Sequence, residues 1–257
     1  MPRRSLPTLR QTITVSVLSA AFLGATGCAF FTDRERPVSA VKASGLKAME
    51  AGDLDLARLE FEEYVARKPS AEGRFLAGQV ALRQGDYRNA IDHLWIAHDS
   101  DPNRSDITDM LANALLESGR EAELSKFLHD QTREHGSLTD YLRLGKFAEV
   151  MGDADTAEQA YLTAAAIDKG QSVEPQIALA DLYQTLGDKE RTLDRLAMAL
   201  YLDPENTIIA DRIRSLGEIP GQTFMKIPTE AIRIDPAFGT EYTGVDENTK
   251  ANPLPER

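Results

Sequence analysis

Small and apolar residues recur along this chain with the period of paired helices. One glycine returns every 33 to 35 residues, and each copy separates two helix-like stretches: Gly52, Gly85, Gly119, Gly152 and Gly187. A fixed period of this length is typical of stacked helical pairs, in which each unit packs only on its neighbours. The pattern therefore predicts an all-α solenoid over residues 38–205.

The positions around each glycine have the same chemistry in nearly every copy. Seven residues before it the residue is always small: Gly45, Gly78, Ala112, Gly145 and Ala180. Nine residues after it the residue is always large and apolar: Phe61, Leu94, Leu128, Tyr161 and Leu196. The position five residues after it is small in four copies and Leu124 in the third. Antiparallel helices approach closely only where side chains are small, so we expect the large residue to fill the wider part of the same interface.

The glycine also suits the turn between the two helices of a pair, because it adopts the left-handed conformation without steric cost. In four copies an aspartate follows it, where a short acidic side chain can cap the second helix: Asp53, Asp86, Asp153 and Asp188. Arg120 stands at this place in the third copy, so we expect that turn to be less well defined.

This pattern resembles the tetratricopeptide repeat family over residues 38–205, for example in GQVALRQGDYRNAIDHLWIAHDSDP, which begins at Gly78. The resemblance implies an α-solenoid of about five helix-turn-helix repeats. Residues 206–217 read as a capping helix, with Asn206 as a start signal and Gly217 as a stop signal. Residues 218–257 are rich in proline, and we expect an extended, largely disordered tail or one loosely laid against the solenoid.

The first 27 residues have the pattern of a targeting segment, with three arginines before an apolar stretch over residues 13–27. Cys28, the only cysteine, follows small residues, and this resembles the lipobox of bacterial lipoproteins. The resemblance implies acyl chains on Cys28 and, with Ala29 next to it, the periplasmic face of the outer membrane. Residues 28–37 would form a linker of at most ~30 Å between the lipid and the first helix. An ordinary cleaved signal peptide, which would give a secreted or periplasmic protein, remains the alternative.

The charge of the chain and its motifs limit the chemistry that we expect. The formal net charge is −12, so nucleic acid is a poor partner. No phosphate-binding loop and no nucleophile motif is present, so we expect no enzyme, no cofactor and no small-molecule substrate. His93 and His98 stand five apart on one predicted helix and do not share a face, so we expect no metal site there. Trp95 is expected to be a packing residue.

In the family that the repeats resemble, the first helix of each repeat lines a groove that binds protein partners. Transferred to this sequence, the resemblance gives a candidate groove with apolar, amide and charged side chains: Lys42, Phe75, Gln79, Asp109, Asn113, Leu142, Lys146, Asp181 and Gln184. Phe75, Asn113 and Lys146 are the preferred contacts, because they combine an apolar anchor, a carboxamide and a charge.

These features favour a lipid-anchored adaptor of the bacterial cell envelope that binds another protein. In architecture it resembles lipoproteins that assist pilus or secretion-complex assembly, which is an analogy of architecture alone. A periplasmic holdase chaperone that binds extended polypeptides is the alternative. A carbohydrate-binding module is disfavoured, because Phe75 is the only aromatic residue in the candidate groove.

Overall fold

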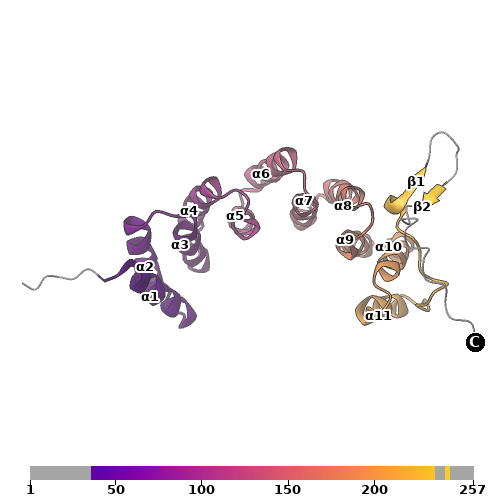
Figure 1. The fold of residues 1–257 in the computed structure, drawn as a ribbon, viewed down its shortest axis with the longest axis horizontal. Coiled ribbons are helices and arrows are strands. Elements are labelled where there is room, and N and C mark those ends of the chain that lie inside the picture. Colours follow the sequence, from indigo (N-terminus) through magenta and orange to yellow (C-terminus); the bar gives the residue numbers. More distant parts are fainter. Residues whose placement is uncertain (1–35, 235–240, 244–257) are drawn as a thin grey trace, which may run out of the picture. The chain divides into compact units, whose positions relative to one another are not determined.

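The structure is a computed structural model that describes residues 36–234 and 241–243. Within these ranges the chain forms eleven α-helices followed by a short 3-10 helix and two strands (Figure 1). The α-helices are α1 Val38–Glu50, α2 Leu54–Arg67, α3 Ala71–Arg83, α4 Tyr87–Ser100, α5 Ser105–Glu117, α6 Glu121–Glu134, α7 Leu138–Val150, α8 Ala154–Asp168, α9 Val173–Thr185, α10 Lys189–Leu202 and α11 Thr207–Ser215.

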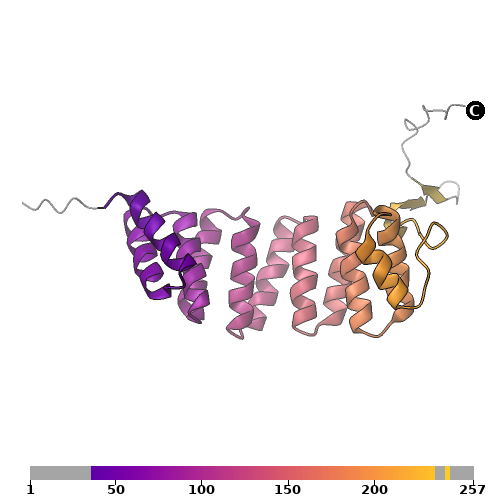
Figure 2. The ribbon, with the colours of Figure 1, turned by 90° about the horizontal axis from the view of Figure 1, so that it is seen from below.

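The helices pack in consecutive pairs, from α1 with α2 to α9 with α10, and each pair packs on the next. Within the unit that begins at residue 37, Figure 1 shows α3, α5, α7 and α9 along the inner side of a curved row. Helices α4, α6 and α8 lie along its outer side, and Figure 2 shows the same row from below. The all-α solenoid of five repeats with a capping helix is confirmed. We call the side formed by the first helices the inner face.

The small and large positions face each other across the helix pairs. A Cβ atom on Gly45 would lie 2.7 Å from Cε1 of Phe61, and one on Gly78 would lie 2.7 Å from Cγ of Leu94. Both large side chains are fully buried. The helices of these pairs are therefore in contact at a point where even a methyl group does not fit.

The turns also follow the sequence pattern. All five turn glycines have φ between 73° and 79°, and no atom lies within 4 Å of where a Cβ would stand. Glycine is therefore required here by backbone conformation rather than by space. The four aspartates each accept a hydrogen bond from a backbone N–H in the first turn of the second helix, as Asp153 does from Thr156 at 3.1 Å. Arg120 begins α6 without a side-chain cap. The expectation of a less well-defined turn is wrong, because the backbone N–H of Arg120 donates to the carbonyl of Leu115 at 2.9 Å, as the residue after the glycine does in the other turns.

The third repeat is the most loosely packed of the five pairs. Helices α5 and α6 approach each other along less of their length than the two helices of any other repeat. Leu124, which is fully buried, stands where other repeats have alanine or threonine. It belongs, with Phe127 and Leu128 from α6, to a core shared with the neighbouring repeats.

The chain beyond α11 packs back against the fifth repeat. We expected a tail over residues 218–257 that is largely disordered or loosely laid against the solenoid, and residues 224–230 form specific contacts with the solenoid. Phe224 and Met225 pack against the core between α10 and α11, and the backbone N–H of Lys226 donates to the carbonyl of Ala197 at 3.2 Å. Glu230, in a 3-10 helix over Thr229–Ala231, forms an ion pair with Arg195.

A short antiparallel ribbon follows this segment. Strand β1, Ile232–Ile234, pairs with β2, Glu241–Thr243, and Arg233 stands opposite Tyr242. The remaining tail residues, 235–240 and 244–257, lie outside the described part of the chain.

The predicted targeting segment, Cys28 and the linker up to residue 35 also lie outside the described residues. Pro37 precedes α1 and is the residue at its N-cap. In the part of the chain that the structure covers, none of the helices has the length and apolar character needed to span a bilayer.

Candidate functional site: the inner face

The nine candidate groove residues lie on the first helices of the repeats, and all are exposed or half-buried. Each stands at one of three repeat positions, which are four and three residues apart along the first helix and therefore share one face. For example, Phe75 and Gln79 lie on α3, while Leu142 and Lys146 lie on α7. The structure therefore presents these side chains on the surface of the first helices rather than in the core.

Charged side chains join neighbouring first helices along this face. Lys42 on α1 forms an ion pair with Glu72 on α3, with 2.5 Å between Nζ and Oε1. Near the other end, Arg212 of α11 pairs with Asp181 on α9 at 2.6 Å and donates to Gln184 at 2.9 Å. These candidate residues already have partners within the chain, so they hold the repeats in register.

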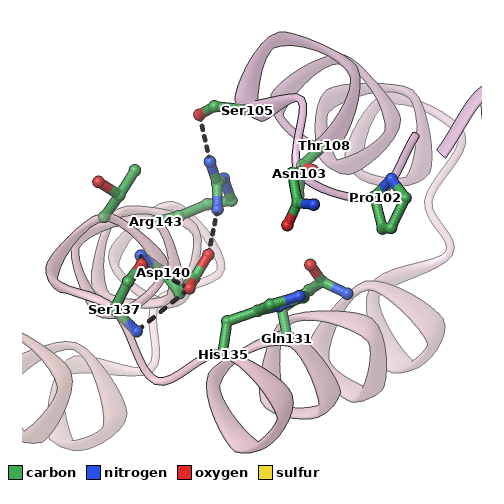
Figure 3. A pocket seen from close by; sticks show the side chains of 10 residues that line it. Pro102, Asn103, Ser105, Thr108, Gln131, His135, Ser137, Asp140 and Arg143 are labelled. Atoms are coloured by element: carbon green, nitrogen blue, oxygen red, sulfur yellow. Dashed lines mark hydrogen bonds and ion pairs between the residues drawn. The ribbon is translucent and has the colours of Figure 1, made fainter.

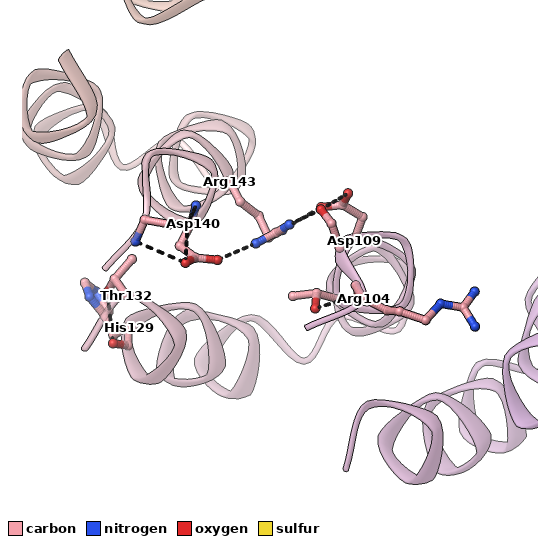
Figure 4. Close-up of polar contacts among 9 residues, drawn as sticks. Arg104, Asp109, His129, Thr132, Asp140 and Arg143 are labelled. Atoms are coloured by element: carbon pink, nitrogen blue, oxygen red, sulfur yellow. Dashed lines mark hydrogen bonds and ion pairs between the residues drawn. The ribbon is translucent and has the colours of Figure 1, made fainter. Parts of the chain in front are cut away.

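Arg143 forms the most buried of these links. Its side chain is only 4% exposed, and its Nε donates to Asp109 of α5 at 2.5 Å. Its Nη1 donates to Asp140, one turn earlier on α7, at 2.9 Å, and its Nη2 donates to Ser105 at 2.6 Å. Figure 4 shows the guanidinium between the two carboxylates. Since every N–H-bearing nitrogen of the group is engaged, Asp109 has a structural role as well as a surface position.

The middle of the inner face carries side chains that the chain itself does not use. Gln79, Asn113 and Lys146 occupy the same repeat position on α3, α5 and α7, one residue after the small residue. In the part of the chain that the structure describes, the side chains of these three residues form no hydrogen bond or ion pair. The ammonium of Lys146 lies 5.8 Å from the centre of the Phe147 ring. We call this set the polar row. It offers two carboxamides and a charge to a ligand.

Phe75 lies beside the polar row, and its ring has contacts within the chain. The guanidinium of Arg104 lies 5.0 Å from the centre of its ring, at a distance suited to a cation–π contact. The ring is half-buried and packs against the core of repeats two to four. Its apolar surface is therefore smaller than that of a free aromatic anchor.

Sequence reasoning did not single out Arg143 or Arg212 as inner-face residues. The signal in the sequence is weak, because each lies outside the three repeated groove positions. Arg212 belongs to the capping helix, 28 residues from its partner Gln184.

A pocket of about 510 Å³ lies at this end of the inner face and is lined by Asp181, Gln184, Thr185 and Arg212.

The two histidines of α4 have separate surroundings. His93 contacts Arg74 and Glu62, each at 3.2 Å. His98 is buried beside Trp95 and Phe127, whose rings meet edge to face with centres 5.0 Å apart. Trp95 is confirmed as a packing residue. No group of three or more potential metal ligands occurs in the part of the chain that the structure describes.

Comparisons with solved structures show which fold this is. A tetratricopeptide repeat protein from Parabacteroides merdae is 15% identical with a TM-score of 0.53, and the alignment covers 70% of this chain and 72% of that one. The MamA protein is 18% identical with a TM-score of 0.50, and the alignment covers 66% of this chain and 94% of MamA. A tetratricopeptide repeat protein from Thermus thermophilus is 21% identical with a TM-score of 0.47, covering 70% and 98%. No family model and no curated protein matches the chain. The repeats of this chain have the tetratricopeptide repeat fold.

Proposed function

We propose that this protein is a non-catalytic adaptor that binds one protein partner along its inner face. The polar row supports the proposal most directly. Gln79, Asn113 and Lys146 are surface side chains at equivalent positions of three successive repeats, and the chain leaves their polar groups without partners. Carboxamides can donate to and accept from a peptide main chain, and Lys146 adds a preference for an acidic group.

The proposal includes an anchor at Cys28. The sequence from residue 1 to 28 resembles a lipoprotein signal, and the formal net charge of −12 disfavours nucleic acid as a partner. Two or more acyl chains would hold the protein stably at a membrane. The adaptor would then hold its partner close to the periplasmic face of the outer membrane, where it could assist the assembly of an envelope complex such as a pilus or a secretion system.

Photocrosslinking in intact cells that produce the protein tests this function. A photoreactive residue replaces Asn113, and a matched control carries it at Lys126 on the outer helix α6, whose side chain is 81% exposed. We expect one dominant crosslinked protein from Asn113 and none from Lys126. Many crosslinked envelope proteins would instead favour the holdase. Capture from Lys126 alone would contradict binding on the inner face.

Two variants measure the contribution of the polar row once the partner is known. Asn113→Ala removes a carboxamide and should weaken binding about fivefold, the effect of one hydrogen bond. Lys146→Glu reverses a charge and should weaken binding further if the bound segment is acidic. Because both residues are exposed, neither variant should change the thermal unfolding temperature by more than about 2 °C. Unchanged affinity in both variants would contradict the role of the polar row.

The anchor has its own test. Mass spectrometry of the protein extracted from membranes should show acyl chains on Cys28 and no residues before it. Cys28→Ser should move the protein from the membrane fraction to the soluble fraction. A protein that stays in the soluble fraction with Cys28 intact and unmodified would contradict the anchor without affecting the adaptor.

A further inference from the structure

The loose packing of the third repeat leaves a pocket that the inner face does not use. It has a volume of about 330 Å³ and lies where the start of α5, the end of α6 and the start of α7 meet (Figure 3). We call it the third-repeat pocket. Its walls include Asn103, Thr108, Gln131, Thr139 and Arg143. The volume is at the small end of the range of roughly 300–1,000 Å³ that is typical of ligand sites.

The sequence explains why this pocket is open. In the first repeat, apolar residues pack where the two helices of the pair meet far from their turn, with Val41 and Val65 both buried. The equivalent residues of the third repeat are Thr108 and Thr132, whose hydroxyls donate to carbonyls of their own helices. Thr108 lines the pocket, and its short side chain does not fill the space. The second, fourth and fifth repeats have a bulkier side chain at one or both of these positions, as Arg74 and His98 are in the second, so the short threonines leave the third repeat more open there.

The charged side chains Arg143 and Asp140, which line the pocket, are already paired within the chain. Each nitrogen of the Arg143 guanidinium already donates one hydrogen bond, to Asp109, Asp140 or Ser105. The Asp140 carboxylate also accepts from the backbone and the hydroxyl of Ser137, which completes the cap of α7. A charged ligand would have to break these contacts or leave its own charge unpaired. The pocket therefore favours a neutral ligand.

The groups that remain available are neutral hydrogen-bonding groups. Figure 3 shows the carboxamides of Asn103 and Gln131 pointing toward one another across the pocket. In the described part of the chain, Asn103 and Thr139 form no hydrogen bond. Gln131 is only 6% exposed, so its carboxamide has little freedom to move. Each carboxamide presents both a donor and an acceptor.

We infer that the third-repeat pocket is a second binding site, and that it takes a short neutral polar segment of an extended polypeptide. A peptide group presents one N–H donor and one carbonyl acceptor, which complements a carboxamide. Asn103 and Gln131 each pair with a peptide group or with a side-chain carboxamide of the segment. Thr139 supplies a further hydroxyl at the mouth of the pocket. This site goes beyond the proposed adaptor function, because it uses neither the polar row nor any other residue of the candidate groove.

Nuclear magnetic resonance on the full chain in detergent tests the site. The probes are the capped tripeptide acetyl-Gly-Gln-Gly-amide and two matched tripeptides with glutamate or lysine at the centre. The neutral peptide should shift the side-chain amide signals of Asn103 and Gln131, and both charged peptides should bind about fivefold more weakly or less. Equal binding of a charged peptide would overturn the inference. Shifts confined to Gln79 and Asn113, or no shift with any of the peptides, would overturn it as well.

Two variants separate this site from a general effect on folding. Asn103→Asp replaces an exposed loop carboxamide with a carboxylate of the same shape, so it should weaken the neutral peptide about fivefold and leave the fold intact. Gln131→Met removes the buried carboxamide at similar volume and should have the same effect on binding. Unchanged affinity in both variants would overturn the assignment. Crosslinking from Asn113 does not depend on this pocket, so failure of one proposal is distinguishable from failure of the other.

Discussion

Gly45 and Phe61 lie so close together that a methyl group on Gly45 would stand 2.7 Å from Cε1 of the phenylalanine ring. Phe61 is fully buried, so its ring has little room to move. We expect Gly45→Ala to lower the free energy of unfolding by about 1–2 kcal/mol, because overpacking costs about 1–3 kcal/mol and better helix propensity offsets up to ~1 kcal/mol of it. Urea denaturation followed by circular dichroism measures the change.

A rescue variant tests whether the contact is the cause. The third and fifth repeats pair alanine with leucine at these two positions, as in Ala112 with Leu128. In the background of Phe61→Leu, Gly45→Ala should therefore be neutral or stabilising. The reverse change Ala112→Gly should cost about 1–2 kcal/mol, because it lowers helix propensity and removes a buried methyl group. Equal destabilisation by Gly45→Ala in both backgrounds would contradict the packing argument.

Arg120 gives the third repeat the one turn among the five without an aspartate cap. We expect Arg120→Asp to raise the free energy of unfolding by about 0.5–1 kcal/mol, because the new carboxylate would accept from the first turn of α6 as Asp153 does for α8. Arg120→Ala is the matched control, since it removes the exposed ion pair with Glu123 and adds no cap. The argument fails if the two variants are equally stable.

Local pattern in the sequence was enough to predict the helix pairs and their turns. The close approach of Gly45 and Phe61 and the cap at Asp153 both depend on residues within one repeat, so the repeated letters revealed them. The sequence also showed that Leu124 and Arg120 depart from the pattern. The sequence did not reveal the third-repeat pocket, because this pocket depends on how α5, α6 and α7 pack together.

Contacts between distant residues explain what the sequence did not reveal. Arg143 reaches Asp109 and Ser105, which are 34 and 38 residues away. The last segment packs on the fifth repeat through Pro228, whose Cβ lies 2.6 Å from where a side chain on Gly170 would begin. Proline and glycine in this segment suggested a disordered or loosely laid tail, and Pro228 instead packs closely on Gly170, between α8 and α9. Composition alone does not distinguish these two outcomes.

His98 should make the stability of the fold depend on pH. Burial lowers the pKa of its imidazole below the ordinary value of 6.5, although a hydrogen bond with Gln131 acts in the opposite direction, and His135, Asp99 and Glu134 also act on the ring. The unfolded chain therefore binds a proton more readily than the folded chain, so the free energy of unfolding should fall as the pH falls below about 6.5.

Denaturation at pH 7.5 and at pH 5.5 checks this expectation. His98→Leu should lose less stability between the two pH values than the unchanged protein does, because it lacks the buried titrating group. His129→Gln is the matched control, because it replaces an exposed histidine that does not act on the His98 ring. The same pH dependence in the protein with and without His98 would contradict the assignment.

Glu230 and Arg195 should determine whether the segment after α11 stays docked. Their side chains are 10% and 12% exposed, and the carboxylate accepts from Arg195 at 2.7 Å and from Gln176 at 3.3 Å. Burial raises the pKa of Glu230, but the hydrogen bonds and the charge of Arg195 outweigh it, so the net pKa lies below the ordinary 4.5. The ionised carboxylate therefore stabilises docking above that pH, and this stabilisation is lost as the pH falls below 4.5.

Limited trypsin digestion at Lys226 measures the docking. This residue donates to the carbonyl of Ala197 through its backbone and pairs with Asp194 through its side chain, so cleavage requires the segment to open. Glu230→Ala removes a charged hydrogen-bond partner, worth about 1–3 kcal/mol, and should speed cleavage about tenfold or more. Glu218→Gln changes an exposed carboxylate of the same segment and should leave the rate unchanged. Equal cleavage of both variants would mean that Phe224 and Met225 hold the segment without the ion pair.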